Sequence, residues 1–229
     1  NNMGAFGGPD IITDGLVLAV DAGSTRSYPG SGTTTTSLVN SNTGTLTNGV
    51  GFTSDNGGSF TFDGVNDYIA FNNTITMPSA NLTSVAWVKL DSYLSQNSTI
   101  GFHPDAGNGN AGFRVYAVSA ASLGVWTRDG AGGVTAIATV NGIPLNEWVQ
   151  IAFVLNGTNG KFYKNGAEIL SGTFAQAPAA LSSAPVWIAR YSGGGFRIDG
   201  KSTACMLYDR ALSAAEVLQN YNAQKNRFI

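Results

Sequence analysis

The sequence is poor in cysteine, histidine and charge. It holds one cysteine and one histidine among 229 residues, and charged residues make up 11% of the chain, against about 25% in an average soluble domain. The single cysteine, Cys205, excludes an intramolecular disulfide, and its surroundings favour a small buried residue in a strand. The low charge predicts a largely neutral surface of Ser, Thr, Asn and Gly.

Other absences exclude whole classes of partner. With a formal net charge of −2, the chain lacks the basic surface that nucleic-acid binding needs. No apolar run approaches the ~20 residues that span a bilayer. The start of the sequence also lacks the charged-then-apolar pattern of a secretory signal. We therefore expect neither nucleic acid nor a membrane among the partners.

Groups that could perform catalysis are sparse. A retaining glycosidase needs two carboxyl groups about 5–5.5 Å apart. The chain has three glutamates, each isolated beside a turn or a helix start: Glu147, Glu168 and Glu216. Asp63 and Asp67 are four residues apart, which places a turn between them. The lone His103 fits an exposed turn residue, and nothing marks a nucleophile elbow around any serine. The sequence predicts a protein that is not an enzyme.

What the sequence does hold is an all-β pattern. Short β-prone runs alternate with Gly, Asn, Asp, Ser and Pro from Leu16 onward, which is typical of a sandwich or barrel within one large domain. The expected strands are 16–20, 59–63, 67–71, 82–90, 98–102, 111–118, 122–127, 134–140, 148–155, 160–164, 168–172, 186–190 and 203–209. Residues 148–155 are covered on both faces at period two, which indicates a central strand. Asn165-Gly166 predicts a type I′ hairpin turn.

The remaining segments complete the expected layout. Ser213 and Glu216 have the spacing of a capping box, which predicts one short helix after the last strand. Residues 30–36 are low in complexity and fit an irregular rim loop. Residues 1–10 are polar and glycine-rich, so we expect a mobile arm or an inter-subunit strap. A single domain is expected over residues 11–229.

Four segments stand out along the chain: 59–69 (SFTFDGVNDYI), 82–88 with its tryptophan, 148–154 followed by 162–166, and 207–222. In this order they resemble the laminin-G-like, concanavalin A-like jelly-roll family over nearly the whole chain. The resemblance implies an all-β jelly-roll sandwich of two antiparallel sheets with a short C-terminal helix.

The opening segments 10–23 and 27–33 resemble laminin-G-like virion proteins of tailed phages, marine ones especially. Those relatives usually continue with a tryptophan-containing, glycine-rich stretch, whereas this chain has residues 35–43. The resemblance implies a non-enzymatic structural protein on the virion surface, a head-decoration or fibre-like component. Its partners would be capsid or tail proteins and copies of itself. The alternative is a carbohydrate-binding adhesin that contacts host-surface glycans, and a third reading is a degenerate glycosidase.

A ligand site can be sought among rim aromatics and loop oxygens. Tyr28, Tyr93, Tyr116, Trp126 and Tyr191 are the aromatic candidates, while Trp87, Trp148 and Trp187 are expected in the core. Tyr28 and Tyr191 are expected to be exposed. The candidate ligand-binding residues are Tyr28, Tyr191, His103, Asp105 and Asn108.

Calcium is the alternative to an absence of cofactors, because relatives hold it at the sandwich rim. Two loops offer oxygen clusters: Asp105, Asn108 and Asn110 in one, and Asp63, Asn66 and Asp67 in the other. Neither has the acid density of a tight calcium site, so no cofactor is expected. Turn chemistry also explains the Asp63 loop.

Overall fold

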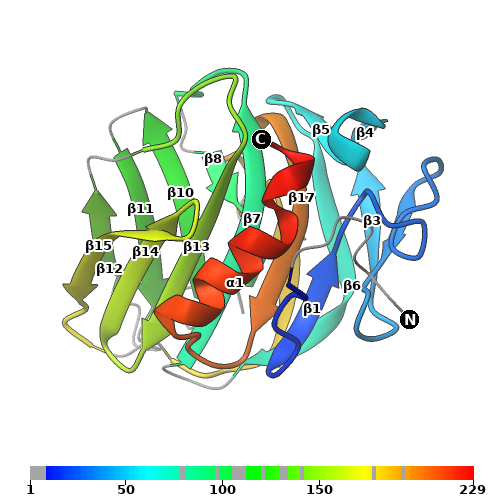
Figure 1. The fold of residues 1–229 in the computed structure, drawn as a ribbon. Helices are drawn as coiled ribbons and strands as arrows, with labels where there is room; N and C mark the ends of the chain where they lie inside the picture. The colour runs from blue at the N-terminus through cyan, green and yellow to red at the C-terminus, as the bar shows by residue number, and fades with distance from the viewer. Residues whose placement is uncertain are drawn as a thin grey trace.

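A computed structural model describes residues 9–77, 81–95, 98–104, 112–119, 122–128, 134–139, 142–176, 179–191 and 194–229. The chain is an all-β sandwich with one helix near its end, as expected (Figure 1). The strands pair antiparallel and form two layers. The expected arm falls almost entirely on residues 1–8, which lie outside the described residues.

The first layer is one sheet in the order β15-β14-β13-β7-β17-β5-β4, with β1 paired to β17. Its strands are β1 (Leu16–Val20), β4 (Gly51–Thr53), β5 (Ser59–Asp63), β7 (Asn81–Leu90), β13 (Val149–Asn156), β14 (Asn159–Lys164), β15 (Ala167–Thr173) and β17 (Asp199–Tyr208). β13 lies between β14 and β7, which confirms its prediction as a central strand. The Asn165-Gly166 turn is also confirmed, since both residues have positive φ angles, 52° and 77°.

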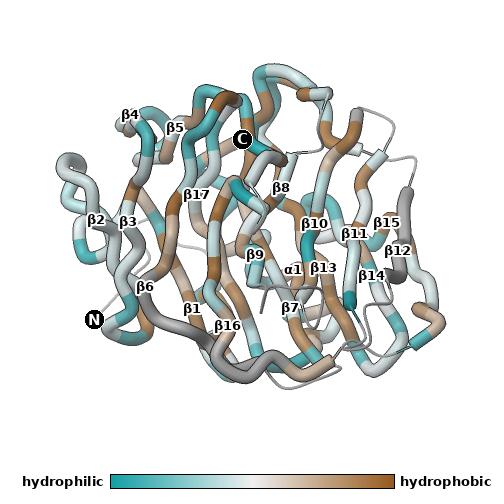
Figure 2. Tube along the Cα trace, turned by 180° about the vertical axis from the view of Figure 1, so that it is seen from behind, coloured by the Kyte–Doolittle hydropathy of each residue, from teal (hydrophilic) through white to brown (hydrophobic). Residues whose placement is uncertain are grey.

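The second layer consists of two sheets that lie side by side (Figure 2). One has the order β2-β3-β6-β16-β9 and the other β12-β11-β10-β8. Their strands are β2 (Thr34–Thr36), β3 (Thr43–Thr47), β6 (Tyr68–Met77), β8 (Ser98–Ile100), β9 (Phe102–Pro104), β10 (Gly112–Ser119), β11 (Ser122–Arg128), β12 (Val134–Thr139) and β16 (Leu181–Ile188).

Two strand predictions are corrected in this layer. Residues 98–102 were expected to form one strand, but Gly101 takes a positive φ of 69° and divides it into β8 and β9. This φ suits glycine, and it sends the chain from one sheet to the other. Residues 30–36 were expected as an irregular loop, yet Thr34–Thr36 pairs with β3. Strand β3 of this layer and strand β4 of the first layer were also not predicted.

The hydrophobic core lies between the two layers. Aromatic side chains from both layers fill it, and none of the following exposes more than 5% of its surface: Phe60, Phe62, Phe71, Phe102, Phe113, Phe153 and Phe162. Cys205 is 2% exposed and belongs to this core, as predicted. Burial raises the pKa of its thiol to about 12, so the cysteine is a packing residue.

Helix α1 (Ala214–Gln224) covers the outer face of the first layer (Figure 1). Val217 packs on this face, and the Trp87 ring stacks on Phe228, just beyond the helix, with centroids 4.2 Å apart. Two short 3-10 turns, η1 (Asp55–Gly57) and η2 (Lys225–Arg227), complete the structure. Among the described residues, no helix covers the outer face of the second layer.

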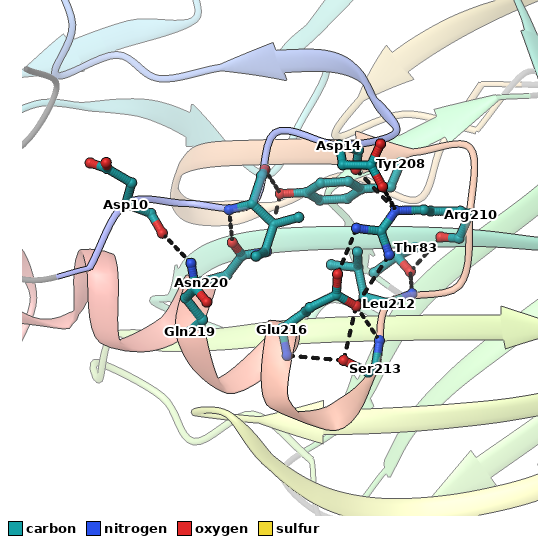
Figure 3. Close-up of polar contacts among 11 residues, drawn as sticks. Asp10, Asp14, Thr83, Tyr208, Arg210, Leu212, Ser213, Glu216, Gln219 and Asn220 are labelled. Atoms are coloured by element: carbon teal, nitrogen blue, oxygen red, sulfur yellow. Dashed lines mark hydrogen bonds and ion pairs between the residues drawn. The ribbon is translucent and has the colours of Figure 1, made fainter. Parts of the chain in front are cut away.

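The helix start is a polar cluster that also holds the beginning of the domain (Figure 3). The predicted capping box is confirmed, because the Ser213 side chain accepts from the Glu216 N–H and the Glu216 side chain accepts from the Ser213 N–H. Arg210 joins Glu216 to Asp14 through ion pairs of 2.6 and 2.9 Å. The Asn220 side chain accepts a hydrogen bond from the N–H of Ile12 at 2.8 Å. Residues 10–14 are therefore fixed to the sandwich.

Candidate functional site

The outer face of the second layer carries aromatic and arginine side chains, because strand alternation sends core residues inward and these residues outward. On β10, Phe113 and Val115 are buried in the core, whereas Arg114 lies on the opposite side. Trp126 on β11 is directly opposite Arg114 in the register. The antiparallel pairing therefore brings the two side chains together on one face.

The neighbouring sheet continues this surface. Trp187 of β16 is paired with His103 of β9 on one side and with Ala70 of β6 on the other. Tyr68 lies two residues before Ala70 and so shares its face. The ring of His103 is 6.1 Å from that of Trp187 and 5.6 Å from that of Tyr191. The His103 imidazole thus lies near Trp187 and Tyr191, which belong to two different groups of side chains.

The first of these, the depression group, surrounds an open surface depression of about 250 Å³. Its members are Arg114, Trp126, Arg128, Tyr191 and Phe196. The Arg114 guanidinium lies 3.9 Å from the centre of the Phe196 ring. The Arg128 guanidinium lies 4.4 Å from the centre of the Trp126 ring and donates a hydrogen bond to the Tyr191 hydroxyl at 3.1 Å. Stacking and hydrogen bonding therefore fix both arginines.

The second, the Tyr68 group, consists of Tyr68, Trp187, Arg190 and Arg197. The guanidinium groups of Arg190 and Arg197 lie 4.4 and 5.4 Å from the centre of the same Tyr68 ring. Arg190 also lies 5.9 Å from the Trp187 ring centre. We call the two groups, together with His103, the aromatic–arginine face.

Residues 189–197, which follow β16, supply side chains to both groups. Ala189 and Phe196 adopt positive φ angles of 61° and 55°, which are uncommon for residues with a side chain and cost about 1–3 kcal/mol each. The Tyr191 N–H donates to the Gly195 carbonyl at 3.3 Å. The bend places the Tyr191 and Phe196 rings in edge contact at 5.3 Å. Backbone strain is therefore used to hold two aromatic rings over β10 and β11.

The electrostatics of the face are set by burial and by neighbouring charges. Burial is the main cause that lowers the pKa of Arg197, and the positive charge of Arg190 lowers it further. Asp67 is 3% exposed, and burial raises the pKa of its carboxyl group. The Asp67 carboxylate also accepts a hydrogen bond from the backbone N–H of Asp63 at 3.1 Å. This carboxyl group is therefore held in the turn beneath Arg197.

The structure places the five candidate ligand-binding residues differently. Tyr191 lies at the centre of the aromatic–arginine face. His103 is wrongly expected as an exposed turn residue, because it is fully buried in β9 and its Nδ1 donates to the Phe113 carbonyl at 2.7 Å. Tyr28 is wrongly expected to be exposed, since it is 4% exposed and packs edge-on against Phe60 in the core. Asp105 and Asn108 lie outside the described residues.

Expectations for two tryptophans and for Asp63 can be checked in the structure. Trp87 is fully buried, as expected, but it packs with Phe228 on the outer face of the first layer, whereas Trp187, also expected in the core, is partly exposed on the aromatic–arginine face. Asp63 forms the expected turn, because its side chain accepts from the N–H groups of Val65 and Asn66. Within the described ranges, no three His, Cys, Asp or Glu side chains are grouped so that they could hold a metal ion. Likewise, none of the described helices is long and apolar enough to cross a membrane.

Sequence reasoning missed the arginines of the face. It named Tyr116, Trp126 and Tyr191 as candidate aromatics but gave no role to Arg114 or Arg128. A signal was present, since Arg114 and Tyr116 alternate with Phe113 and Val115 along one strand, and Trp126 and Arg128 alternate with Val125 and Thr127 along the next. Such alternation indicates two strands with one core face and one functional face.

Comparisons with known proteins agree with this architecture. A family model described as "Concanavalin A-like lectin/glucanases superfamily" matches residues 62–218. A search of curated protein sequences finds no match. Among solved structures, the receptor-binding domain of botulinum neurotoxin type G is similar, with a TM-score of 0.69 and 16% identity over 92% of this chain and 52% of that one.

Two further solved structures are similar to the same extent. Domain 4 of an extracellular arabinanase from Geobacillus stearothermophilus, in complex with arabinotriose, has a TM-score of 0.67 and 14% identity over 90% of this chain and 98% of its own. The ligand-binding domain of botulinum neurotoxin serotype D, in complex with N-acetylneuraminic acid, has a TM-score of 0.69 and 14% identity over 93% of this chain and 52% of its own. The chain thus spans about half the length of these toxin domains and nearly all of the arabinanase domain.

Proposed function

The chain belongs to the concanavalin A-like lectin/glucanases superfamily, and we propose that it is a non-enzymatic carbohydrate-binding domain whose ligand lies on the aromatic–arginine face. One observation carries the proposal. Partly exposed aromatic rings lie beside planar hydrogen-bond donors on the sandwich face that α1 does not cover. Aromatic rings pack on the apolar faces of sugar rings, while a few placed polar groups orient a ligand.

The named structural neighbours support this proposal. The two toxin domains are described as receptor-binding and ligand-binding domains, and the arabinanase domain is in complex with arabinotriose. The acidic side chains of this chain support a non-enzymatic role. Glu168 pairs with Lys161, and Glu216 pairs with Arg210 at the helix start. Both glutamates are thus engaged away from the aromatic–arginine face.

The experiment measures glycan binding directly. The purified chain is applied to a glycan array, and each positive glycan is titrated calorimetrically against wild type and Trp126→Ala. Because one stacked ring contributes about 1–3 kcal/mol when it is buried by a ligand, we expect the Trp126 variant to bind about tenfold more weakly. Leu218→Ala, at an exposed position on α1 on the opposite side of the sandwich, is the matched control and should bind as wild type does.

Two results would count against the proposal. If no glycan binds at any concentration that calorimetry can use, carbohydrate binding is wrong. If glycans bind but Trp126→Ala and Leu218→Ala behave alike, the ligand lies on another face. Melting curves of both variants show whether the fold is retained.

For the biological setting, the domain would be displayed on the surface of a tailed-phage virion, as a head-decoration or fibre-like component. The support is the resemblance of residues 10–23 and 27–33 to laminin-G-like virion proteins. Capsid or tail proteins and copies of itself would be its structural partners, and host glycans its target. Antibody labelling of purified particles, imaged by electron microscopy, tests this setting. Absence of the chain from particles would refute it without bearing on glycan binding.

A further inference from the structure

Positive charge is concentrated on the aromatic–arginine face. The chain contains seven arginines and has a formal net charge of −2. Four of the seven lie on this face: Arg114, Arg128, Arg190 and Arg197. Asp67, whose charge acts on Arg197, is buried in its turn. Counted over the described residues, the face therefore gathers positive charge on a protein whose overall charge is slightly negative.

Arg210 and Arg227, which lie outside the face, differ from the arginines of the face because each is paired with an acidic side chain. Arg210 is paired with Glu216 and Asp14, and Arg227 is paired with Asp21 at 2.6 Å. Within the part of the chain that the structure describes, Arg128, Arg190 and Arg197 form no ion pair with any acidic side chain. Their guanidinium groups lie over aromatic rings instead. Stacking orients a guanidinium group without forming an ion pair, and the negative charges of Asp67 and Asp63 act on Arg197 only from beyond ion-pair distance.

Hydrogen-bonding capacity also remains on these side chains. The buried Nε atoms of Arg128, Arg190 and Arg197 have no hydrogen-bond partner among the described residues. A surface ligand cannot reach these buried atoms, so an anion would bind the parts of the three partly exposed side chains that solvent reaches. Two guanidinium groups share the Tyr68 ring, and their mutual repulsion contributes to the lowered pKa of Arg197. A bound anion would relieve this repulsion and accept hydrogen bonds.

The arrangement favours a chain of anions over a single one. The Tyr68 group and the depression group approach each other at the rings of Trp187 and Tyr191, with the buried ring of His103 between them. They lie on a path that crosses β6, β16, β9, β10 and β11. At about 4.8 Å between neighbouring strands, this path is roughly 19 Å long. It is long enough for an oligosaccharide that presents acidic groups at intervals.

We propose that the ligand of the aromatic–arginine face is an anionic glycan, with carboxylate or sulfate groups on a sugar backbone. Its sugar rings pack on Trp126 and Tyr191, and its acidic groups bind Arg128 at one end and the Arg190–Arg197 pair at the other. This inference rests on the proposed carbohydrate-binding function and adds the chemical class of the ligand. Arginine suits this task because its planar donors match the geometry of carboxylate and sulfate oxygens.

The test uses pairs of polymers that differ only in charge. Polygalacturonate is compared with its methyl ester, and dextran sulfate with dextran, by calorimetry on the intact chain. We expect at least one anionic polymer to bind about tenfold or more tightly than its neutral counterpart, with the affinity falling steeply as salt is raised. Single-stranded DNA serves as an anionic polymer that is not a glycan, and it should bind far more weakly.

Matched variants locate the charge effect. Arg128→Gln and Arg197→Gln should each weaken binding of the anionic polymer about tenfold, which is the usual cost of one charge-assisted contact. Arg128→Lys keeps the positive charge and should lose less affinity for the anionic polymer than Arg128→Gln does. Arg26→Gln makes the same charge change at an exposed position in the loop after β1 and should alter the affinity less than twofold. Melting curves confirm that each variant is folded.

The outcomes separate this inference from the proposed function. If neutral polymers bind as well as anionic ones, or if Arg26→Gln weakens binding as much as Arg128→Gln, the anionic ligand is wrong while carbohydrate binding stands. If DNA binds as tightly as the acidic glycans, the face is a general polyanion surface and the inference is wrong. If no glycan of either kind binds, the proposed function and this inference both fail.

Discussion

Glu216 provides the sharpest test of how the helix is attached to the sandwich. Its carboxylate accepts from the two terminal guanidinium nitrogens of Arg210, at 2.6 and 3.1 Å, and from the N–H and hydroxyl of Ser213, at 2.7 and 2.9 Å (Figure 3). The hydrogen bonds from Arg210 are the largest cause that lowers the pKa of Glu216, to about 2, and those from Ser213 add to them. Burial acts in the opposite direction. The carboxylate is therefore charged over nearly the whole pH range in which the protein folds.

The size of this stabilisation follows from the difference between the pKa of Glu216 in the folded protein and its pKa in the unfolded protein. Each unit of difference in pKa corresponds to about 1.4 kcal/mol, so a fall from the ordinary 4.5 to about 2 gives an upper limit of about 3 kcal/mol. The side chain is 27% exposed, and solvent screens exposed pairs, so we expect about 1–2 kcal/mol. Because the folded pKa is the lower one, this stabilisation is complete above pH 4.5 and is lost as the pH falls towards 2.

Glu216→Gln isolates the charge, because glutamine also fits this position of a capping box. Urea unfolding of wild type and variant should differ by about 1–2 kcal/mol at pH 7, and the difference should shrink from pH 4.5 downward and vanish near pH 2. Glu147→Gln, at an exposed glutamate, is the control and should not alter stability at any pH. A difference between wild type and Glu216→Gln that stays constant with pH would refute the assigned role of the charge.

Three further predictions concern the cap, the core and catalysis. Ser213→Ala should lower the free energy of unfolding by about 0.5–2 kcal/mol through loss of the cap, and unchanged denaturant midpoints would contradict this. Cys205, 2% exposed and with its thiol pKa raised to about 12, should react with a thiol reagent at pH 8 only after denaturant is added; rapid labelling of the native protein would refute its burial. The domain should release no reducing sugar from laminarin or a mixed-linkage glucan, and turnover abolished by mutating one acid would overturn the non-enzymatic assignment.

Much of the fold could be predicted because local patterns decide it. Three features depend on residues close in sequence: the covering of both faces of β13, the Asn165-Gly166 turn and the Ser213–Glu216 box. The strand break at Gly101 could not be foreseen, since it depends on which sheet each half joins. Short strands such as Thr34–Thr36 were missed for the same reason. Their pairing with β3 outweighs weak local preferences.

The candidate site was only half predictable. Aromatic residues could be named from the sequence, yet their exposure could not. Tyr28 is buried because it packs against Phe60 and donates its hydroxyl to the Gly32 carbonyl at 2.9 Å. Trp187 is partly exposed because its strand turns it away from the core. Long-range register, such as the pairing of Trp187 with His103, decides which side chains meet, and the local sequence does not encode it.

The last prediction concerns Gly124 of β11, whose substitution should affect the aromatic–arginine face. It is paired with Tyr116 across β10 and β11, and a β-carbon added there would lie 2.6 Å from the ring atom Cζ of Tyr116. Since a ring can tilt more easily than a backbone can shift, Gly124→Ala should displace Tyr116 and cost little stability. The Arg114 guanidinium lies 5.1 Å from the centre of that ring.

Displacing Tyr116 therefore disturbs the support of Arg114, and we expect glycan binding to weaken about threefold to tenfold, or roughly 1 kcal/mol. The measurement is calorimetry on Gly124→Ala, on Tyr116→Ala and on the double variant. If Gly124 acts through Tyr116, adding Gly124→Ala to the Tyr116→Ala background should have no further effect. Additive losses in the double variant would show that the glycine acts through the backbone of β11 instead, and the ring would not be the support that the geometry assigns to Arg114.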